Sequence, residues 1–225
     1  NGTIEIKNLC FSYNQEKMIF SNFNLQIPKG NKIMILGSSG SGKSTILKLL
    51  MKYYEVNYNM IYLNEIDINN CSVLNVRNHI ALMSQNDILY TDTIFNNITL
   101  YQNVDLKNFQ EICRLTCVDE FAKELFLGYQ TKLEENGLNL SGGQRQRILL
   151  ARLFLQEKGI VLIDEGLNAI DIRLERKILT NIFSKYPNTT IIVVSHRVEN
   201  QDLFHQVIHF ENGQIKFLSK ERLYD

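Results

Sequence analysis

Two glycine-rich segments of this chain have the residue types and the spacing of phosphate-binding sites. The first reads Gly37-Ser38-Ser39-Gly40-Ser41-Gly42-Lys43-Ser44. It fits the P-loop pattern, in which glycines let backbone N–H groups converge on phosphate oxygens at the start of a helix. Lys43 adds a positive charge for the β- and γ-phosphates, Ser44 supplies a hydroxyl for Mg²⁺, and Thr45 is a second donor to phosphate. The flanking strand and helix disfavour the alternative, a chance Gly/Ser-rich turn.

The second segment, Leu140 to Arg147, reads LSGGQRQR and begins about a hundred residues later. It opens a predicted helix, whose N-terminus favours anions. Because it has no lysine of its own, we expect it to meet nucleotide that is held by another copy of the chain. The two segments together predict an ATPase that works as a sandwich dimer.

Two carboxylates follow a short apolar segment near the C-terminal third of the chain. Ile160 to Ile163 is predicted to be a buried strand, and Asp164 and Glu165 come directly after it. At the carboxyl end of such a strand, Asp164 can hold the Mg²⁺ shell, and Glu165 can face the γ-phosphate and polarise water. The alternative interpretation is a strand followed by an acidic helix cap, a position that also favours carboxylates.

Three further side chains are candidates for the same site. Thr190 to Ser195 is another apolar strand, and His196 after it can donate to the γ-phosphate and orient the attacking water. Gln85 follows a strand at 80–83 and can contact Mg²⁺ and water, although by itself it is an ordinary loop residue. Tyr13 can stack on adenine through the face of its ring; the alternative is a buried tyrosine at a strand end.

The hydrophobic pattern predicts an α/β fold in which helices and strands alternate around these motifs. Residues 3 to about 36 are expected to be β, and the strand at 31–36 runs straight into the phosphate loop. Residues 86 to about 157 are predicted to form an inserted helical subdomain. The α/β pattern then returns, with a strand at 160–163, a helix at 172–184, a strand at 190–195 and a closing hairpin at 206–210 and 214–218, turned by Asn212-Gly213.

Composition and charge disfavour several classes of protein. The formal net charge is +0, with 24 basic and 24 acidic residues, which disfavours a dominant nucleic-acid-binding face. There is no run of roughly 18 apolar residues that would span a bilayer. Cys113 and Cys117 share a face of a predicted helix and lack further ligands nearby, so we expect buried reduced thiols rather than a metal site. The chain begins at Asn1 without a methionine, which predicts that it is cut from a longer protein.

The order of these motifs resembles the nucleotide-binding domain of ABC transporters. The likeness runs from Tyr13 to the hairpin near 213 and implies ATP and Mg²⁺ as cofactors. It implies a P-loop NTPase core of mixed, largely parallel sheet, with an N-terminal antiparallel β subdomain and an inserted α-helical signature subdomain. All of 1–225 would be one ATPase domain, with 1–85 and 158–225 as the RecA-like core and β subdomain, and about 86–157 as the helical subdomain.

The resemblance also implies how two copies combine. They would pair head to tail, so that Ser141, Gly143 and Gln144 of one complete the site at the phosphate loop of the other. Asp171 would be the dimer-contact residue between the two sites, and Glu165 would be the general base. Here the loop before Asp171 reads Gly166-Leu167-Asn168-Ala169-Ile170, where the family often has Ala-Thr-Ser-Ala-Leu, so it lacks the usual hydroxyls.

The segments at 83–98 and 128–137 resemble those of exporters, with Glu135 at the acidic position that touches the partner's membrane domain. This implies a transmembrane domain, fused on the same polypeptide, and a place at the cytoplasmic face of the plasma membrane. Peptides, bacteriocins among them, lipids and drugs are all candidate cargoes. The alternatives are an importer ATPase on a separate chain and a non-transport ABC ATPase that acts on DNA or ribosomes.

Overall fold

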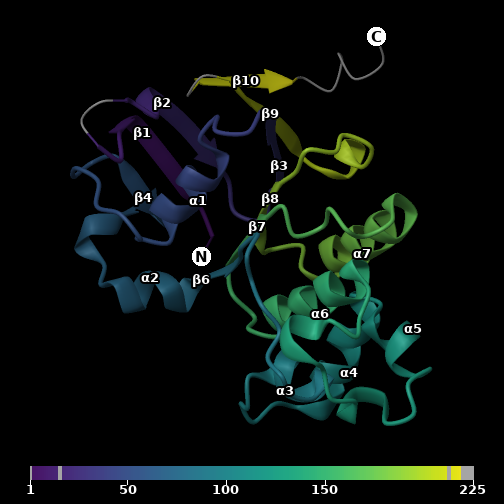
Figure 1. The fold of residues 1–225 in the computed structure, drawn as a ribbon. Coiled ribbons are helices and arrows are strands. Elements are labelled where there is room, and N and C mark those ends of the chain that lie inside the picture. Colours follow the sequence, from purple (N-terminus) through teal and green to yellow (C-terminus); the bar gives the residue numbers. More distant parts are fainter. Residues whose placement is uncertain (1, 15–16, 212–213, 219–225) are drawn as a thin grey trace. The chain divides into compact units, whose positions relative to one another are not determined.

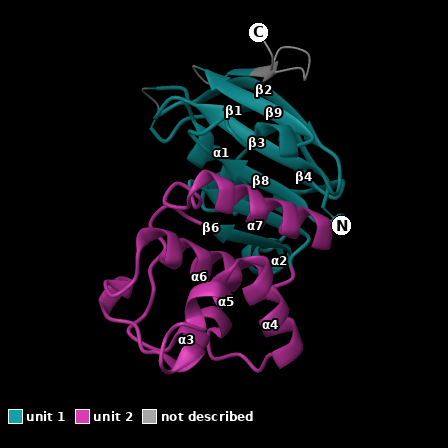
Figure 2. Ribbon diagram, turned by 90° about the vertical axis from the view of Figure 1, so that its right-hand side faces the viewer, with its two compact units in different colours: residues 1–82, 158–165, 186–225 teal, residues 83–157, 166–185 magenta. Residues whose placement is uncertain are grey.

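The computed structural model describes residues 2–14, 17–211 and 214–218, and the chain divides into two compact units (Figures 1 and 2). The first unit contains residues 1–82, 158–165 and 186–225, and the second contains 83–157 and 166–185. The second unit therefore includes 166–185, which the sequence pattern placed with the core. The predicted turn at Asn212-Gly213 lies outside the described residues.

The first unit contains two sheets, as expected from the sequence. A four-stranded antiparallel sheet has the order β2-β1-β4-β5. Its strands are β1 (Ile4–Phe11), β2 (Phe20–Ile27), β4 (Ile61–Leu63) and β5 (Ile66–Asp67). The same unit contains α1 (Lys43–Leu50), which precedes β4, and a 3-10 turn at Ile68–Asn70 and α2 (Val73–His79), which follow β5.

The second sheet is mixed and has the order β10-β9-β3-β8-β7-β6. Its strands are β3 (Lys32–Gly37), β6 (Ile80–Met83), β7 (Ile160–Asp164), β8 (Thr190–Val194), β9 (Gln206–Glu211) and β10 (Gln214–Leu218). Every residue of β7 and of β8 is buried, which is typical of parallel strands that are covered on both faces. These strands therefore show continuous apolar runs rather than alternation.

The register of the parallel strands brings the polar residues to one edge of this sheet. Val194 of β8 pairs with Ile35 of β3 on one side and with Asp164 of β7 on the other. Ile35, Val194 and Asp164 therefore lie in one row across the sheet, and the residues that follow them in the sequence lie at the same edge. Ligands of open α/β sheets bind outside the carboxyl ends of the strands, which is where the predicted site residues emerge.

The second unit is helical, as predicted for the inserted segment. Helices α4, α5 and α6 pack together, α3 contacts α6, and α4 contacts α7. The bounds are α3 (Ile94–Thr99), α4 (Leu106–Leu115), α5 (Val118–Ala122), α6 (Gly142–Phe154) and α7 (Ile172–Lys185), with 3-10 turns at Gly128–Gln130 and Glu135–Gly137. None of the helices in the described residues is long and apolar enough to cross a membrane.

Cys113 and Cys117 do not share a helix face, so that prediction was wrong. Cys113 lies in α4, whereas Cys117 caps the N-terminus of α5 with a φ of 56°, because the helix breaks between them. Both thiols are buried, and burial raises the pKa of Cys113 to about 12 and that of Cys117 to about 11. No group of three potential metal ligands among His, Cys, Asp and Glu occurs in the part of the chain that the structure describes.

Two residues at the ends of β3 fix the strand that leads into the phosphate loop. At its start, the buried Lys32 ammonium donates to the carbonyl oxygens of Gly30 and Tyr186, both at 2.8 Å, and also to those of Pro187 and Thr189. At its end, Gly37 has a φ of 144°, and a Cβ there would lie only 2.4 Å from the carbonyl oxygen of Phe210 in β9. The first contact ties β3 to the turn before β8, and the second requires glycine.

Gly37→Ala is expected to lower the free energy of unfolding by about 3 kcal/mol or more, since the methyl group must displace a backbone carbonyl in addition to the strain of a positive φ. The matched control is Gly40→Ala, because Gly40 has a φ of 75° and a Cβ there would meet no described atom within 4 Å beyond its chain neighbours. That control should cost only about 1 kcal/mol, from backbone strain. Urea unfolding without nucleotide measures both, and equal losses would contradict this account.

Lys32→Met should remove a pH dependence of stability. Burial lowers the pKa of Lys32 from 10.5 to about 8, so the unfolded chain binds more protons between these values and native stability rises with pH across that window. This difference in the pKa of Lys32 between the unfolded and the folded chain corresponds to about 3 kcal/mol. Urea unfolding is measured at pH values from about 8 to about 10.5. Over this range the free energy of unfolding of the unsubstituted protein should rise by that amount relative to that of Lys32→Met. A constant difference would refute the charge effect.

Candidate functional site

The phosphate loop connects β3 to α1 and presents the start of that helix. Gly42 caps α1 with a φ of 105°, and no side chain of the described residues caps its first turn. The first N–H groups of a helix have no partner within the helix, so they remain available to an anion. The hydroxyl of Ser41 is buried in the same loop and has no partner among the described residues. An orphaned donor in this position fits a bound phosphate group.

Lys43 lies inside the loop that it is expected to serve. Its ammonium donates to the carbonyl oxygens of Gly37 at 2.8 Å and Ser38 at 2.7 Å, and its side chain is buried. Burial lowers the pKa of Lys43, whereas the carboxylates of Glu165 and Asp164 act to raise it. The loop therefore holds a buried positive charge close to two acidic side chains.

Ser44 and Asp164 meet across the sheet edge. The Ser44 hydroxyl donates to Oδ1 of Asp164 at 3.1 Å, and Asp164 is buried at the end of β7. Burial raises the pKa of Asp164, and the bond from Ser44 acts in the opposite direction. A hydroxyl and a carboxylate beside a phosphate-binding loop are oxygen donors of the kind that a hard divalent cation takes. These two residues therefore fit the metal position that the sequence predicts.

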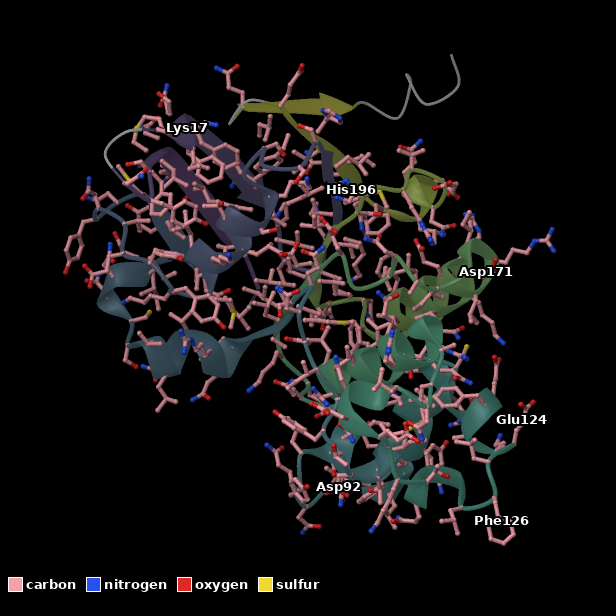
Figure 3. The ribbon with its side chains drawn as sticks, viewed as in Figure 1. Lys17, Asp92, Glu124, Phe126, Asp171 and His196 are labelled. Atoms are coloured by element: carbon pink, nitrogen blue, oxygen red, sulfur yellow. The ribbon has the colours of Figure 1, made fainter. Side chains whose placement is uncertain are left out.

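Glu165 and His196 form a pair at the same edge. Nε2 of His196 lies 2.7 Å from Oε1 of Glu165, and His196 follows the end of β8 (Figure 3). Glu165 has a φ of 56°, uncommon for a residue with a side chain, and its N–H donates to the carbonyl oxygen of Val194 at 3.1 Å. The Glu165 carboxylate is thus fixed both by its backbone and by an imidazole.

Tyr13 contacts the phosphate-loop helix rather than lying buried at a strand end. Its hydroxyl lies 3.0 Å from the Thr45 hydroxyl, and the side chain is 46% exposed. Its ring makes edge contacts with Phe11 and Tyr54, at centroid distances of 5.2 and 5.0 Å. The exposed tyrosine is in a place where stacking on a base next to the loop is feasible.

The second glycine-rich segment begins α6 in the helical unit. Ser141 Oγ accepts from the N–H of Gln144 at 3.2 Å, and Gln144 Oε1 accepts from the N–H of Ser141 at 2.8 Å. This reciprocal capping box satisfies two backbone donors and fixes the helix start. A Cβ at Gly143 would lie 3.0 Å from the carbonyl oxygen of Ala169, so glycine at this position allows the segment 166–171 to approach the start of α6 closely.

Asp171 and Gln85 also lie in the helical unit. The Asp171 carboxylate accepts from the N–H groups of Arg173 at 2.9 Å and Leu174 at 3.4 Å, which caps α7 (Figure 3). Gln85 is exposed in a turn that is closed by Ser84 and Asp87. The structure thus brings Tyr13, the phosphate loop, Asp164, Glu165 and His196 together in the first unit, and it places Gln85, Ser141, Gly143, Gln144 and Asp171 in the second.

Sequence reasoning missed a clamp in the helical unit that holds the segment after Gln85. The Arg152 guanidinium donates to the carbonyl oxygens of Asn97 at 2.7 Å and Ile88 at 2.9 Å, and to the Asn97 side chain at 3.0 Å. The buried Asn97 amide in turn accepts from the N–H of Tyr90 and donates to its carbonyl. A buried asparagine within a helix was the available signal, but Arg152, which completes the clamp, is 55 residues away in the sequence.

Known proteins match this chain over most of its length. The model of the family described as ABC transporter matches residues 20–168. An ATP-dependent lipid A-core flippase of Legionella pneumophila (strain Paris) is 38% identical over 95% of this chain, and one of Vibrio cholerae is 34% identical over 96%. The chain spans only 37% and 38% of the length of these two relatives.

The fold also matches a solved structure, described as a bacterial Atm1-family ABC exporter with ATP bound. The TM-score is 0.89 and the sequence identity 27%, over 96% of this chain and 38% of the other. The chain therefore belongs to the ABC transporter family, as an ATPase domain.

Proposed function

We propose that this chain is the motor of an exporter, which binds ATP with Mg²⁺, pairs head to tail with a second copy and uses hydrolysis to drive cargo across a membrane. The observation that carries the proposal is the convergence of Lys43, Ser44, Asp164, Glu165 and His196 at the carboxyl edge of β3, β7 and β8. A cation, two oxygen donors and a fixed carboxylate are the parts that phosphoryl transfer to water requires.

The phosphate loop would bind ATP by exchanging internal contacts for contacts with phosphate. Lys43 would turn from the carbonyl oxygens of Gly37 and Ser38 to the β- and γ-phosphates, and Thr45 would donate to phosphate. Tyr13 would stack on adenine. Ser44 and Asp164 would hold Mg²⁺, with Gln85 as a further oxygen donor, and the bound ion would neutralise charge on the β- and γ-phosphates.

Glu165 would act on the attacking water. Its carboxylate oxygen can accept a proton from water, or orient the water through a hydrogen bond. His196 already contacts this carboxylate at 2.7 Å, and it would hold the group in position while donating to the γ-phosphate. The fixed backbone of Glu165 supports such a role, because positioning accounts for much of the catalysis of phosphoryl transfer.

The second copy would complete the site. The start of α6, with Ser141, Gly143 and Gln144, would face the γ-phosphate that is bound in the partner, where the positive end of the helix favours an anion. Asp171 would lie at the contact between the two copies. Support comes from the capping box, which holds this helix start in one conformation without nucleotide.

The membrane-spanning part would be fused on the same polypeptide, and this domain would lie at the cytoplasmic face of the plasma membrane. The relatives support fusion, since the chain spans 37% and 38% of their length. Their names, ATP-dependent lipid A-core flippases, favour a lipid as cargo over a peptide or a drug. The balanced net charge of +0 supports the absence of a nucleic-acid partner.

Glu165→Gln should keep ATP binding, stop hydrolysis and trap an ATP-bound dimer, because the amide preserves shape but cannot accept a proton. We expect turnover to fall by a factor of about a thousand or more, in the upper range of general-base effects. Light scattering during size exclusion, with and without ATP and Mg²⁺, measures the mass. The control is Lys43→Ala in the same background, which should remain monomeric. A Glu165→Gln protein that stays monomeric with ATP would contradict the proposed head-to-tail dimer.

Ser141→Arg should abolish turnover yet leave ATP binding by the monomer intact, since Ser141 would serve the site of the opposite copy. Ser141→Ala is the matched control: it also removes the capping hydroxyl, at a cost of about 1 kcal/mol, but adds no bulk or charge. Equilibrium dialysis measures binding and phosphate release measures turnover. Weakened ATP binding by monomeric Ser141→Arg would place Ser141 in its own chain's site instead.

A further inference from the structure

Gln146 connects two segments that are separate in the sequence. It lies in the second turn of α6, beyond the residues that are proposed to meet nucleotide, and its Oε1 accepts from the N–H of Ala169 at 2.8 Å. Ala169 belongs to the loop 166–171, in which the usual hydroxyls of the family are missing. A side-chain amide thus satisfies the backbone donor of Ala169, an exposed residue between the buried Leu167 and Ile170 of the loop.

The same face of α6 is shaped to receive this loop. Gly142 and Gly143 precede Gln146 by four and three residues, and residues at these spacings share one side of a helix. A Cβ at Gly142 would lie 3.1 Å from Ala169 Cβ, and one at Gly143 would lie 3.0 Å from the Ala169 carbonyl oxygen. The two glycines therefore permit the approach, and Gln146 supplies the polar contact that holds it.

The remainder of the loop is fixed at both ends. Leu167 and Ile170 are 3% and 1% exposed, and the N–H of Ile170 donates to the carbonyl oxygen of Leu167 at 3.0 Å. Asp171 then caps α7 through its carboxylate. Between the two buried side chains, the contact with Gln146 is what fixes the backbone of Ala169 against the helix.

We propose that Gln146 is a positioning residue that fastens the loop 166–171 to the start of α6, so that the two surfaces offered to a partner copy move as one piece. This inference rests on the proposed function, in which Ser141, Gly143 and Gln144 meet the partner's nucleotide and Asp171 meets the partner. Gln146 itself would touch neither. Because the loop is already ordered in the monomer, less conformational entropy is lost when the dimer forms. A preordered surface therefore binds its partner more tightly.

The test uses Gln146→Met and Gln146→Glu in the Glu165→Gln background of the longest polypeptide that can be purified. Methionine keeps the length of the side chain but has no oxygen acceptor, whereas glutamate keeps a carboxyl oxygen for the Ala169 N–H. Gln156→Met is the matched control, because Gln156 is exposed just after α6 and its amide contacts only the Arg152 carbonyl among the bonds described. Dimer formation is titrated with ATP and Mg²⁺ by light scattering, and kcat and KM are measured without the Glu165→Gln change.

We expect Gln146→Met to weaken ATP-dependent dimerisation about five- to tenfold, the order of one lost hydrogen bond, and to lower kcat. The affinity of the monomer for ATP should change less than about twofold, since the phosphate loop is untouched. Gln146→Glu should restore dimerisation, and Gln156→Met should match its parent. A merely destabilised fold would not be rescued by glutamate and would also weaken monomer binding.

Hydrogen exchange of the peptide that covers 166–171 provides the direct readout. Exchange at Ala169 should be slow in the parent and in Gln146→Glu, and faster in Gln146→Met. Equal exchange in all three, or dimerisation that Gln146→Met leaves unchanged, overturns the inference while the sandwich dimer stands. A Glu165→Gln parent that never dimerises with ATP overturns the proposed function and the inference with it.

Discussion

The site depends on the parallel register of β3, β8 and β7. Val194 pairs with Ile35 on one side and with Asp164 on the other, and the strands β7 and β8 are buried along their whole length. Buried strands of this kind cannot place a polar group within the sheet at low cost, so the charged and hydroxyl side chains follow where each strand ends. A shift of one residue in this pairing would move Glu165 relative to His196 and Asp164 relative to Ser44. The register of an apolar sheet therefore sets the geometry of a charged site.

The charges at this edge are held by one another and by the backbone. Lys43 is buried with its ammonium on two loop carbonyls, and Asp164 is buried with Ser44 as its donor. Burial alone would disfavour both charged forms, and it lowers the pKa of Lys43 and raises that of Asp164. Opposite charges nearby offset part of this cost. Such a site gains favourable partners when a polyanion and a cation enter together, which is the physical reason why ATP with its metal suits it.

In the helical unit, the exposed start of α6 has to keep one conformation without a ligand. The capping box of Ser141 and Gln144 satisfies two backbone donors of α6, and Gln146 satisfies the Ala169 donor in the loop beside it. In that loop, the side chains of Leu167 and Ile170 are buried, and this packing orders the loop without hydroxyl side chains. A surface that is ordered in advance loses less conformational entropy when a partner binds. The departure of this loop from the common family sequence is thus compatible with an ordered surface.

The sequence by itself determined the features that depend on neighbouring residues. The glycines of the phosphate loop, the apolar runs of β3, β7 and β8, and the helix start at Ser141 could be predicted because each follows from local backbone and burial preferences. Only the tertiary structure decided which of these segments meet. The contact of Glu165 with His196 spans 31 residues and that of Gln146 with Ala169 spans 23, and residues 166–185 joined the helical unit although they follow a strand of the core. The break of the helix before Cys117 was likewise invisible, since the apolar spacing continues through it. Contacts between distant segments depend on how whole elements pack, and a one-dimensional pattern does not contain that information.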